Sequence, residues 1–128
     1  MEKSNMITSE FIKSHPDWMF LYGDNLLQKG EEGHRILYKD LPNCIGIPTK
    51  RKPCHRDDSF FYDKDFTEVT SLIRNTLVTP ILTLSYSKII LVPGIGRQED
   101  ESLLYIHAPL TYHWLVGFLD GIQILNPE

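Results

Sequence analysis

Three short apolar runs, each followed by a polar loop and then by a helical pattern, constrain the fold of this chain most strongly. The runs cover residues 17–23, 43–48 and 89–92, and Gly or Pro bounds each of them. Between the second and third runs, apolar residues recur at helical spacing, at Val69, Leu72, Ile73, Leu77 and Ile81. Strands that alternate with helices predict an α/β fold, in which a mostly parallel or mixed sheet lies between two helix layers.

The remaining helices are predicted from their end signals. Thr8 or Ser9 can cap a short helix that ends at Lys13, and residues 31–41 can form another short helix or an irregular turn. Pro80 predicts a kink or a restart in the helix over 65–86. Residues 101–125 read as a terminal helix, with Pro109 in the first turn of its main part.

Size and charge set outer limits on function. The 128 residues, 41% of them hydrophobic, fit one domain over 1–128 with a single core. With a net charge of −4, the chain lacks the excess of positive charge that is typical of proteins that bind duplex nucleic acid. The chain has no run of about 18 apolar residues, so we expect no membrane partner.

The cysteines predict neither a disulfide framework nor a metal site. Only Cys44 and Cys54 are present, and we expect reduced thiols in a cytosolic protein. Cys54 is next to His55 but lacks a second cysteine at zinc-ligand spacing, so we expect no metal and no other cofactor.

Unusual loops follow all three predicted strands. They cover residues 23–35, 49–52 and 93–97. In open parallel sheets, ligands bind beyond the carboxyl ends of the strands. We therefore expect these three loops to line one ligand-binding crevice.

The first loop carries the residue types that a nucleotide needs. Asp24 and Asn25 directly follow the strand, where their side chains can hydrogen-bond to ribose hydroxyls. Gly30 and Gly33 can bring backbone N–H groups close to a phosphate or the ribose, and Gly23 at the start of the loop is a further ligand-binding candidate. The alternative is that Gly23, Asp24 and Asn25 only form a turn, because turns favour these residue types.

The third loop, PGIGR, resembles an anion-binding turn. Gly94 and Gly96 flank Ile95 after a strand and before a helix, and Arg97 can form a bidentate contact with a phosphate or stay solvated. Three acidic residues follow, Glu99, Asp100 and Glu101, which we interpret as solvated charges or as a bias toward a helix N-terminus.

The second loop and the titratable residues complete the candidate site. Thr49 and Lys50 lie at a strand end, where they can contact a ligand or support the first loop; the alternative is an exposed basic patch over residues 50–52. For a hydrolase, Asp24 and His34 are the only nearby groups that can activate water.

The segments FLYGDNLLQKGEEGHR, PNCIGIPTK and IILVPGIG resemble a family of small macro-domain-like proteins, common in bacteria and bacteriophages. In that family Gly-Asp-Asn-Leu leads into Gly-x-Gly-Gly-Gln-Ala, an Asn-Ala-x-Gly-Ile-Pro-Thr-Lys strand follows, and a late Gly-x-Gly turn precedes a helix with Ala-Pro. The similarity extends from about Trp18 to Leu119, and Ala108 and Pro109 match the Ala-Pro pair.

The resemblance implies a macro-like three-layer α/β/α sandwich that binds ADP-ribose, a related NAD-derived nucleotide or an ADP-ribosylated macromolecule, with possible hydrolysis. Asn25 matches the contact to the distal ribose, and Gly30 and Gly33 match the loop around that ribose and the diphosphate. Residues 94–96 match the second diphosphate loop, and Thr49 and Lys50 match the family's strand end.

Two departures from the family pattern leave a second function open. Residues 32–35 read Glu-Gly-His-Arg where the family has Gly-Gly-Gln-Ala, and Arg97 and Gln98 replace Thr-Gly. Glu31 and Glu32 would repel a diphosphate, an effect that Arg35 and Arg97 can offset. The alternative is a non-catalytic module with a degenerate nucleotide site, which sequesters a signalling nucleotide or binds a protein through an aromatic patch. That patch would comprise Phe60, Phe61 and Tyr62, which can equally pack over the core.

Overall fold

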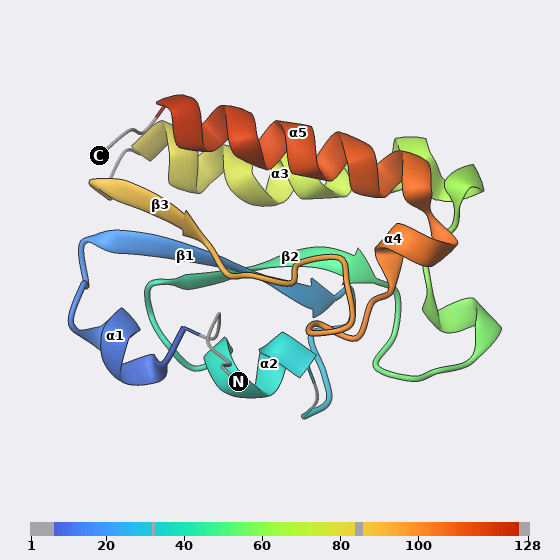
Figure 1. Ribbon diagram of the computed structural model, residues 1–128, viewed down its shortest axis with the longest axis horizontal. Coiled ribbons are helices and arrows are strands. Elements are labelled where there is room, and N and C mark those ends of the chain that lie inside the picture. Colours follow the sequence, from blue (N-terminus) through green and yellow to red (C-terminus); the bar gives the residue numbers. More distant parts are fainter. Residues whose placement is uncertain (1–6, 32, 84–85, 126–128) are drawn as a thin grey trace, which may run out of the picture.

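The computed structural model describes residues 7–31, 33–83 and 86–125, and it has the predicted α/β/α arrangement (Figure 1). A parallel sheet forms the middle layer, with helices on both of its faces. None of the helices in these ranges is long and apolar enough to cross a membrane.

Strand β1 (Trp18–Asn25) lies at the centre of the sheet. It pairs in parallel with β2 (Cys44–Lys50) on one side and with β3 (Lys88–Leu91) on the other, which gives the order β2-β1-β3. Phe20 pairs with Cys44, and Leu21 pairs with Leu91. Strand β1 runs two residues further than predicted, so Asp24 and Asn25 belong to the strand and not to the loop after it.

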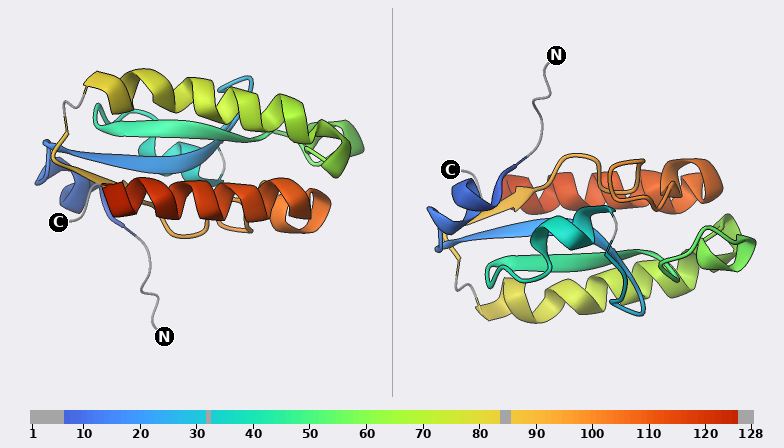
Figure 2. Two further views of the ribbon diagram at one scale, coloured as in Figure 1. Left: turned by 90° about the horizontal axis from the view of Figure 1, so that it is seen from above. Right: turned by 90° about the horizontal axis from the view of Figure 1, so that it is seen from below.

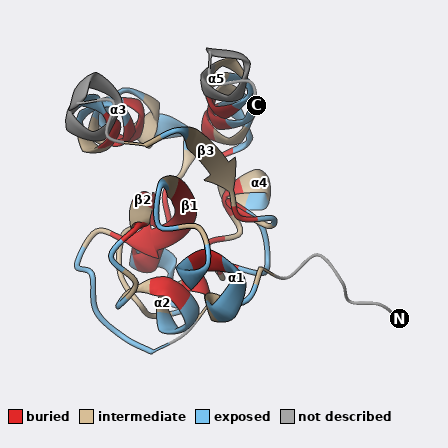
Figure 3. Cartoon of the chain, turned by 90° about the vertical axis from the view of Figure 1, so that its left-hand side faces the viewer, coloured by how far each residue is buried: buried red, intermediate tan, exposed pale blue. Residues whose placement is uncertain are grey.

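The two faces of β1 enter two hydrophobic clusters, because successive side chains of a strand point to opposite faces. Met19 and Leu21 pack in the cluster that includes residues of α3 (Phe66–Thr83) and α5 (Pro109–Leu125). Phe20 and Tyr22 pack in the cluster that includes residues of α1 (Ser9–Lys13) and α2 (Gly33–Tyr38). Figures 2 and 3 show these helix pairs on opposite faces of the sheet.

The helices begin and end largely where their sequence signals place them. The Thr8 hydroxyl accepts a hydrogen bond from the Phe11 N–H at 3.1 Å and caps α1. Helix α3 buries Val69, Ile73 and Leu77, and its backbone continues through Pro80 without the restart that was one of the two predicted outcomes. The terminal segment forms two helices, α4 (Leu104–His107) and α5, and Pro109 is the first residue of α5.

The long segment between β2 and α3 is ordered by its aromatic residues. It contains two 3-10 turns, Asp57–Ser59 and Asp63–Asp65. Phe61 is fully buried and Phe60 is 7% exposed. Of the two alternatives for this aromatic segment, both phenylalanines adopt core packing and not the exposed patch.

The alternative of an exposed basic patch over residues 50–52 is wrong for Lys50, whereas Arg51 and Lys52 are half-buried and paired with carboxylates. Lys50 is buried, and its Nζ lies 5.1 Å from the centroid of the Phe60 ring. The Arg51 guanidinium forms two hydrogen bonds to Glu68, at 2.8 and 3.1 Å, and its Nη2 lies 3.1 Å from Asp65 Oδ1. Lys52 pairs with Asp58 at 2.8 Å.

Candidate functional site

The sheet topology places the predicted loops at one edge. The chain passes from β1 to β2 on one side and then returns across β1 to β3, so the strand order reverses between β1 and β3. In open α/β sheets, ligand sites occupy the carboxyl ends of the strands at such a reversal. The end of β1 and the segment after β3 meet at this point, where the side chain of Asp100 lies against Gly23.

Asp100 is the residue that joins the loops. Its Oδ2 accepts hydrogen bonds from the Gly96 N–H at 2.7 Å and from the Thr49 hydroxyl at 3.0 Å. Its Oδ1 accepts from the N–H and the hydroxyl of Ser102, at 2.9 and 2.6 Å. The interpretation of Asp100 as a solvated charge is wrong: the side chain is buried and holds the end of β2 and the segment after β3 together.

Two glycines, one near the end of β1 and one at the start of α2, make room for Asp100. A Cβ added to Gly23 would lie 1.9 Å from Asp100 Oδ2, and one added to Gly33 would lie 2.9 Å from the Asp100 carbonyl oxygen. The Gly33 N–H donates to Oε2 of the neighbouring Glu101 at 3.2 Å. The close approach that the glycines permit is therefore made by the chain's own acidic segment.

Asp24 and Arg35 form an ion pair at the mouth of the site. Arg35 Nη1 lies 3.0 Å from Asp24 Oδ2, and Arg35 Nε donates to the Gly30 carbonyl at 3.1 Å. Asp24 Oδ1 accepts from the Asn25 N–H at 2.7 Å. Gly46 leaves space for this carboxylate, because a Cβ at Gly46 would lie 2.9 Å from the Cβ of Asp24.

The side-chain amide of Asn25 forms hydrogen bonds to the backbone of its own loop. Its Nδ2 donates to the Lys29 carbonyl at 2.8 Å, and its Oδ1 accepts from the Lys29 N–H at 3.3 Å. These two bonds close the turn after β1. They favour the interpretation of this segment as a turn over the interpretation in which the Asn25 side chain binds a ribose.

His34 is buried and holds the end of β1 from the α2 side. Its Nδ1 accepts a hydrogen bond from the Gly23 N–H at 3.2 Å, so the ring proton lies on Nε2. Burial lowers the pKa of His34, while the nearby charge of Asp100 and a hydrogen bond to Pro93 act in the opposite direction. Burial also raises the pKa of Asp100, against the hydrogen bonds from Ser102 and Gly96.

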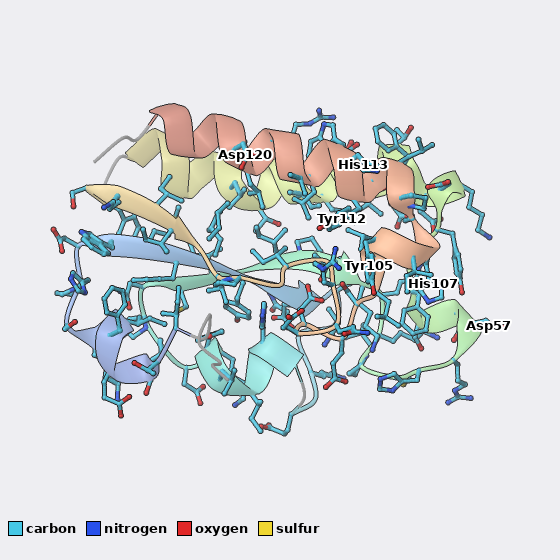
Figure 4. The ribbon with its side chains drawn as sticks, viewed as in Figure 1. Asp57, Tyr105, His107, Tyr112, His113 and Asp120 are labelled. Carbon is cyan, nitrogen blue, oxygen red and sulfur yellow. The ribbon has the colours of Figure 1, made fainter. Side chains whose placement is uncertain are left out.

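The late loop adopts the conformation that its glycines allow. Gly94 and Gly96 have φ angles of 94° and 82°, in the left-handed region that favours glycine. Ile95 packs in the core and is 9% exposed. Arg97 lies over the Tyr105 ring at 4.2 Å, and its Nη1 lies 3.3 Å from the Tyr112 hydroxyl. Figure 4 shows these two tyrosines together where α4 meets α5.

Two adjoining hollows share Asp24 and Arg35. The inner one, of about 10 Å³, has room for about one water molecule. It is lined by Gly23, Asp24, Asn25, Arg35, Lys50 and Asp100. The outer one is open and measures about 270 Å³. It is lined by Tyr22, Asp24, Gln28, Arg35, Lys39 and Asp40. Burial, with a contribution from Asp24, raises the pKa of Tyr22 to about 12, so its hydroxyl stays a donor.

A larger hollow of about 640 Å³ lies along the segment after β2 and takes in Asp57, which Figure 4 labels. Arg51, Asp58 and Tyr62 also line it, and none of the predicted site residues does. In the part of the chain that the structure describes, no group of three or more His, Cys, Asp or Glu side chains could hold a metal ion.

The fold and site define a three-layer α/β protein whose strand-end loops surround a buried carboxylate. A family model described as a family of unknown function (DUF7831) matches residues 2–118, and the chain belongs to that family. No curated protein and no solved structure matches the chain.

Proposed function

We propose that this chain binds ADP-ribose, or a related NAD-derived nucleotide or ADP-ribosyl group, in the outer hollow at the carboxyl edge of the sheet. The observation that carries the proposal is the mixed polar lining of that hollow. Arg35, Lys39, Gln28 and the Tyr22 hydroxyl supply donors, and Asp24 and Asp40 supply acceptors. The resemblance of residues 20–35 and 43–50 to macro-like proteins supports the same ligand class.

The lining suits a sugar phosphate better than it suits a base alone. Ribose hydroxyls both donate and accept, so they can use the carboxylates and the basic groups of one pocket. Arg35 and Lys39 are four residues apart on and just after α2, where side chains share a helix face. A phosphate can contact both of them. The volume of about 270 Å³ is below the usual size of a complete ligand site, so part of the nucleotide extends over the rim.

The contacts favour binding over hydrolysis. Nδ1 of His34 already accepts from Gly23, and its pKa is lowered by burial, so the ring is poorly placed to take a proton from water. Asp24 is paired with Arg35 and also accepts from the Asn25 N–H. Both groups that a hydrolase would need are therefore engaged in holding the site.

Isothermal titration calorimetry with ADP-ribose, ADP and ribose 5-phosphate tests this proposal. We expect ADP-ribose to bind the wild type. Lys39→Ala should weaken this binding about tenfold, which corresponds to a loss of about 1.4 kcal/mol in binding free energy. Lys64→Ala is the matched control, because Lys64 lines the distant hollow. The absence of heat with all three compounds, on folded protein, would refute the proposal.

A turnover assay tests the preference for binding. Incubation of the protein with ADP-ribose-1″-phosphate should release no phosphate. Release that disappears in His34→Gln or Asp24→Asn would show instead that the site is catalytic.

A further inference from the structure

The Tyr22 hydroxyl is a buried polar group in the lining of the outer hollow. Tyr22 is 5% exposed, and its ring centroid lies 5.8 Å from that of Tyr38. Among the residues that the structure describes, none forms a hydrogen bond with the Tyr22 hydroxyl, whereas the Tyr38 hydroxyl donates to the Ile7 carbonyl at 2.8 Å. Buried tyrosine hydroxyls usually have a hydrogen-bond partner, so a ligand in the hollow is a natural acceptor for this one.

The hydroxyl end of Tyr22 lies among the charged groups of the hollow. Burial raises the pKa of Tyr22 to about 12, and the charges of Asp24 and Asp40 add to this effect while that of Arg35 opposes it. All three of these side chains line the hollow. A Cβ added to Gly46 would lie 3.1 Å from Tyr22 Cζ and 3.0 Å from Asp24 Oδ2, so the hydroxyl-bearing carbon and this carboxylate border the same small space.

We propose that Tyr22 determines the ligand specificity of the outer hollow by donating a hydrogen bond to a sugar hydroxyl, which in turn donates to Asp24. The sugar of a sugar phosphate then lies at Tyr22, and its phosphate lies toward Arg35 and Lys39. This inference rests on the proposed function for the identity of the nucleotide. The position of the hydroxyl beside a carboxylate is independent of that identity.

The carboxylate beside Tyr22 favours a neutral oxygen over an anionic one. A phosphate oxygen at the Tyr22 hydroxyl would stand close to Asp24 and be repelled by it. A sugar hydroxyl avoids this repulsion, because it can accept from Tyr22 and donate to Asp24 at the same time. A carboxylate has about four lone-pair sites, and Asp24 accepts one bond from the Asn25 N–H and one from Arg35. A further donor can therefore be accommodated.

The cations of the hollow are already shared with other groups of the protein. Arg35 Nε donates to the Gly30 carbonyl, and Lys39 Nζ lies 3.3 Å from Asp40 Oδ2. A ligand has to compete for these cations, whereas the Tyr22 hydroxyl can bind without the loss of a hydrogen bond between described residues. A donor held in place by burial loses little conformational freedom on binding, and it discriminates against ligands that lack the acceptor.

Two variants of the full chain test the state of the hydroxyl. Tyr22→Phe removes the hydroxyl and keeps the ring. Tyr38→Phe is the matched control, because it removes a neighbouring hydroxyl that is bonded to Ile7 and lies outside the lining of the outer hollow. In urea unfolding, Tyr22→Phe should keep or raise the stability of the wild type, whereas Tyr38→Phe should lower it. A loss in Tyr22→Phe as large as that in Tyr38→Phe would overturn the proposal.

The ligand probes are ADP-ribose, ribose 5-phosphate and inorganic phosphate, followed by calorimetry and by ¹⁵N amide shifts. We expect Tyr22→Phe to weaken the binding of ADP-ribose and of ribose 5-phosphate about tenfold, the effect of one lost hydrogen bond. The same variant should change the binding of inorganic phosphate about twofold or less, because the phosphate lies toward the cations. Tyr38→Phe should change the binding of all three probes about twofold or less.

The outcomes separate this proposal from the proposed function. If ADP-ribose binds the wild type and Tyr22→Phe equally, the role of Tyr22 is wrong and the proposed function stands. If Tyr22→Phe weakens ribose 5-phosphate while ADP-ribose binds no form, the role of Tyr22 stands and the proposed nucleotide is wrong. An equal loss for inorganic phosphate would place the hydroxyl against the phosphate and overturn the sugar assignment. If no probe binds any form, both proposals fail.

Discussion

Substitution of Gly23 by alanine tests whether Asp100 lies where the structure places it. A Cβ at Gly23 would lie 1.9, 2.7 and 2.8 Å from Oδ2, Cγ and Cβ of Asp100. Real contacts are not this short, so the Asp100 side chain has to move. The hydrogen bonds made by Oδ2, to Gly96 and Thr49, are the first that this movement breaks.

The magnitude follows from these two bonds. Hydrogen bonds to a charged group contribute about 1.5–3 kcal/mol each, so their loss lowers the free energy of unfolding by about 3–6 kcal/mol. Alanine is better than glycine in a strand by about 0.5–1 kcal/mol, which offsets a small part of the loss. We therefore expect Gly23→Ala to lower the free energy of unfolding by about 2–5 kcal/mol.

Urea unfolding followed by circular dichroism measures the effect. The matched control is Gly117→Ala in α5, where a new Cβ has no atom within 4 Å. We expect that control to raise stability by about 0.8–1 kcal/mol. In an Asp100→Ala background the cost of Gly23→Ala should shrink, because the contacts to Oδ2 and Cγ are gone while the 2.8 Å contact to the Cβ of residue 100 remains. Equal or higher stability of Gly23→Ala in the wild-type background would refute the reasoning.

Three further perturbations test other parts of the structure by the same unfolding assay. Asn25→Ala removes both bonds to Lys29 and should lower the free energy of unfolding by about 1–3 kcal/mol; unchanged stability would show that the loop is not closed by this amide. The lowered pKa of His34 means that the folded protein binds fewer protons than the unfolded chain, whose histidine titrates near 6.5. The wild type should therefore lose more stability than His34→Gln as the pH falls from 7 to 5, with the exposed His113→Gln as control, and equal slopes would contradict the burial of a neutral His34. Phe61→Ala should lower stability by about 3–5 kcal/mol, because it empties the core; a loss below 1 kcal/mol would instead support a surface role.

The fold could be predicted from local patterns because its elements obey them. The apolar runs of β1, β2 and β3 and the helical spacing of Val69, Ile73 and Leu77 are properties of short stretches. The alternation of elements then limits the topology to a parallel sheet covered on both faces. The end of β1 could not be predicted, since Asp24 and Asn25 are poor strand formers that pairing with β2 holds in the sheet.

The meeting of the three predicted segments at one edge of the sheet could be predicted from the sequence, but the contacts that they make there could not. The strand-end rule places the three loops together, and this requires only the order of the strands. It does not show that Asp100 fills the space beside Gly23. Three consecutive acidic residues look solvated, and the only local signal was Ser102, two residues after Asp100, in the spacing of a side-chain-to-backbone turn.

Long-range burial explains the remaining errors. Phe60 and Phe61 stand in a polar stretch, and their burial depends on the path of the chain between β2 and α3. Asn25 has the chemistry to bind a ribose, but the turn to Lys29 uses both of its amide atoms. In each case the residue type was informative, and the partner lay where no local pattern could reveal it.

A crystal structure of the protein grown with ADP-ribose tests the central claim most directly. We predict ligand density in the outer hollow, with a ribose or phosphate oxygen within hydrogen-bond distance of Arg35 or Lys39. Density in the hollow along Asp57 and Tyr62 instead, or none at saturating ligand, would contradict a nucleotide site at the carboxyl edge of the sheet.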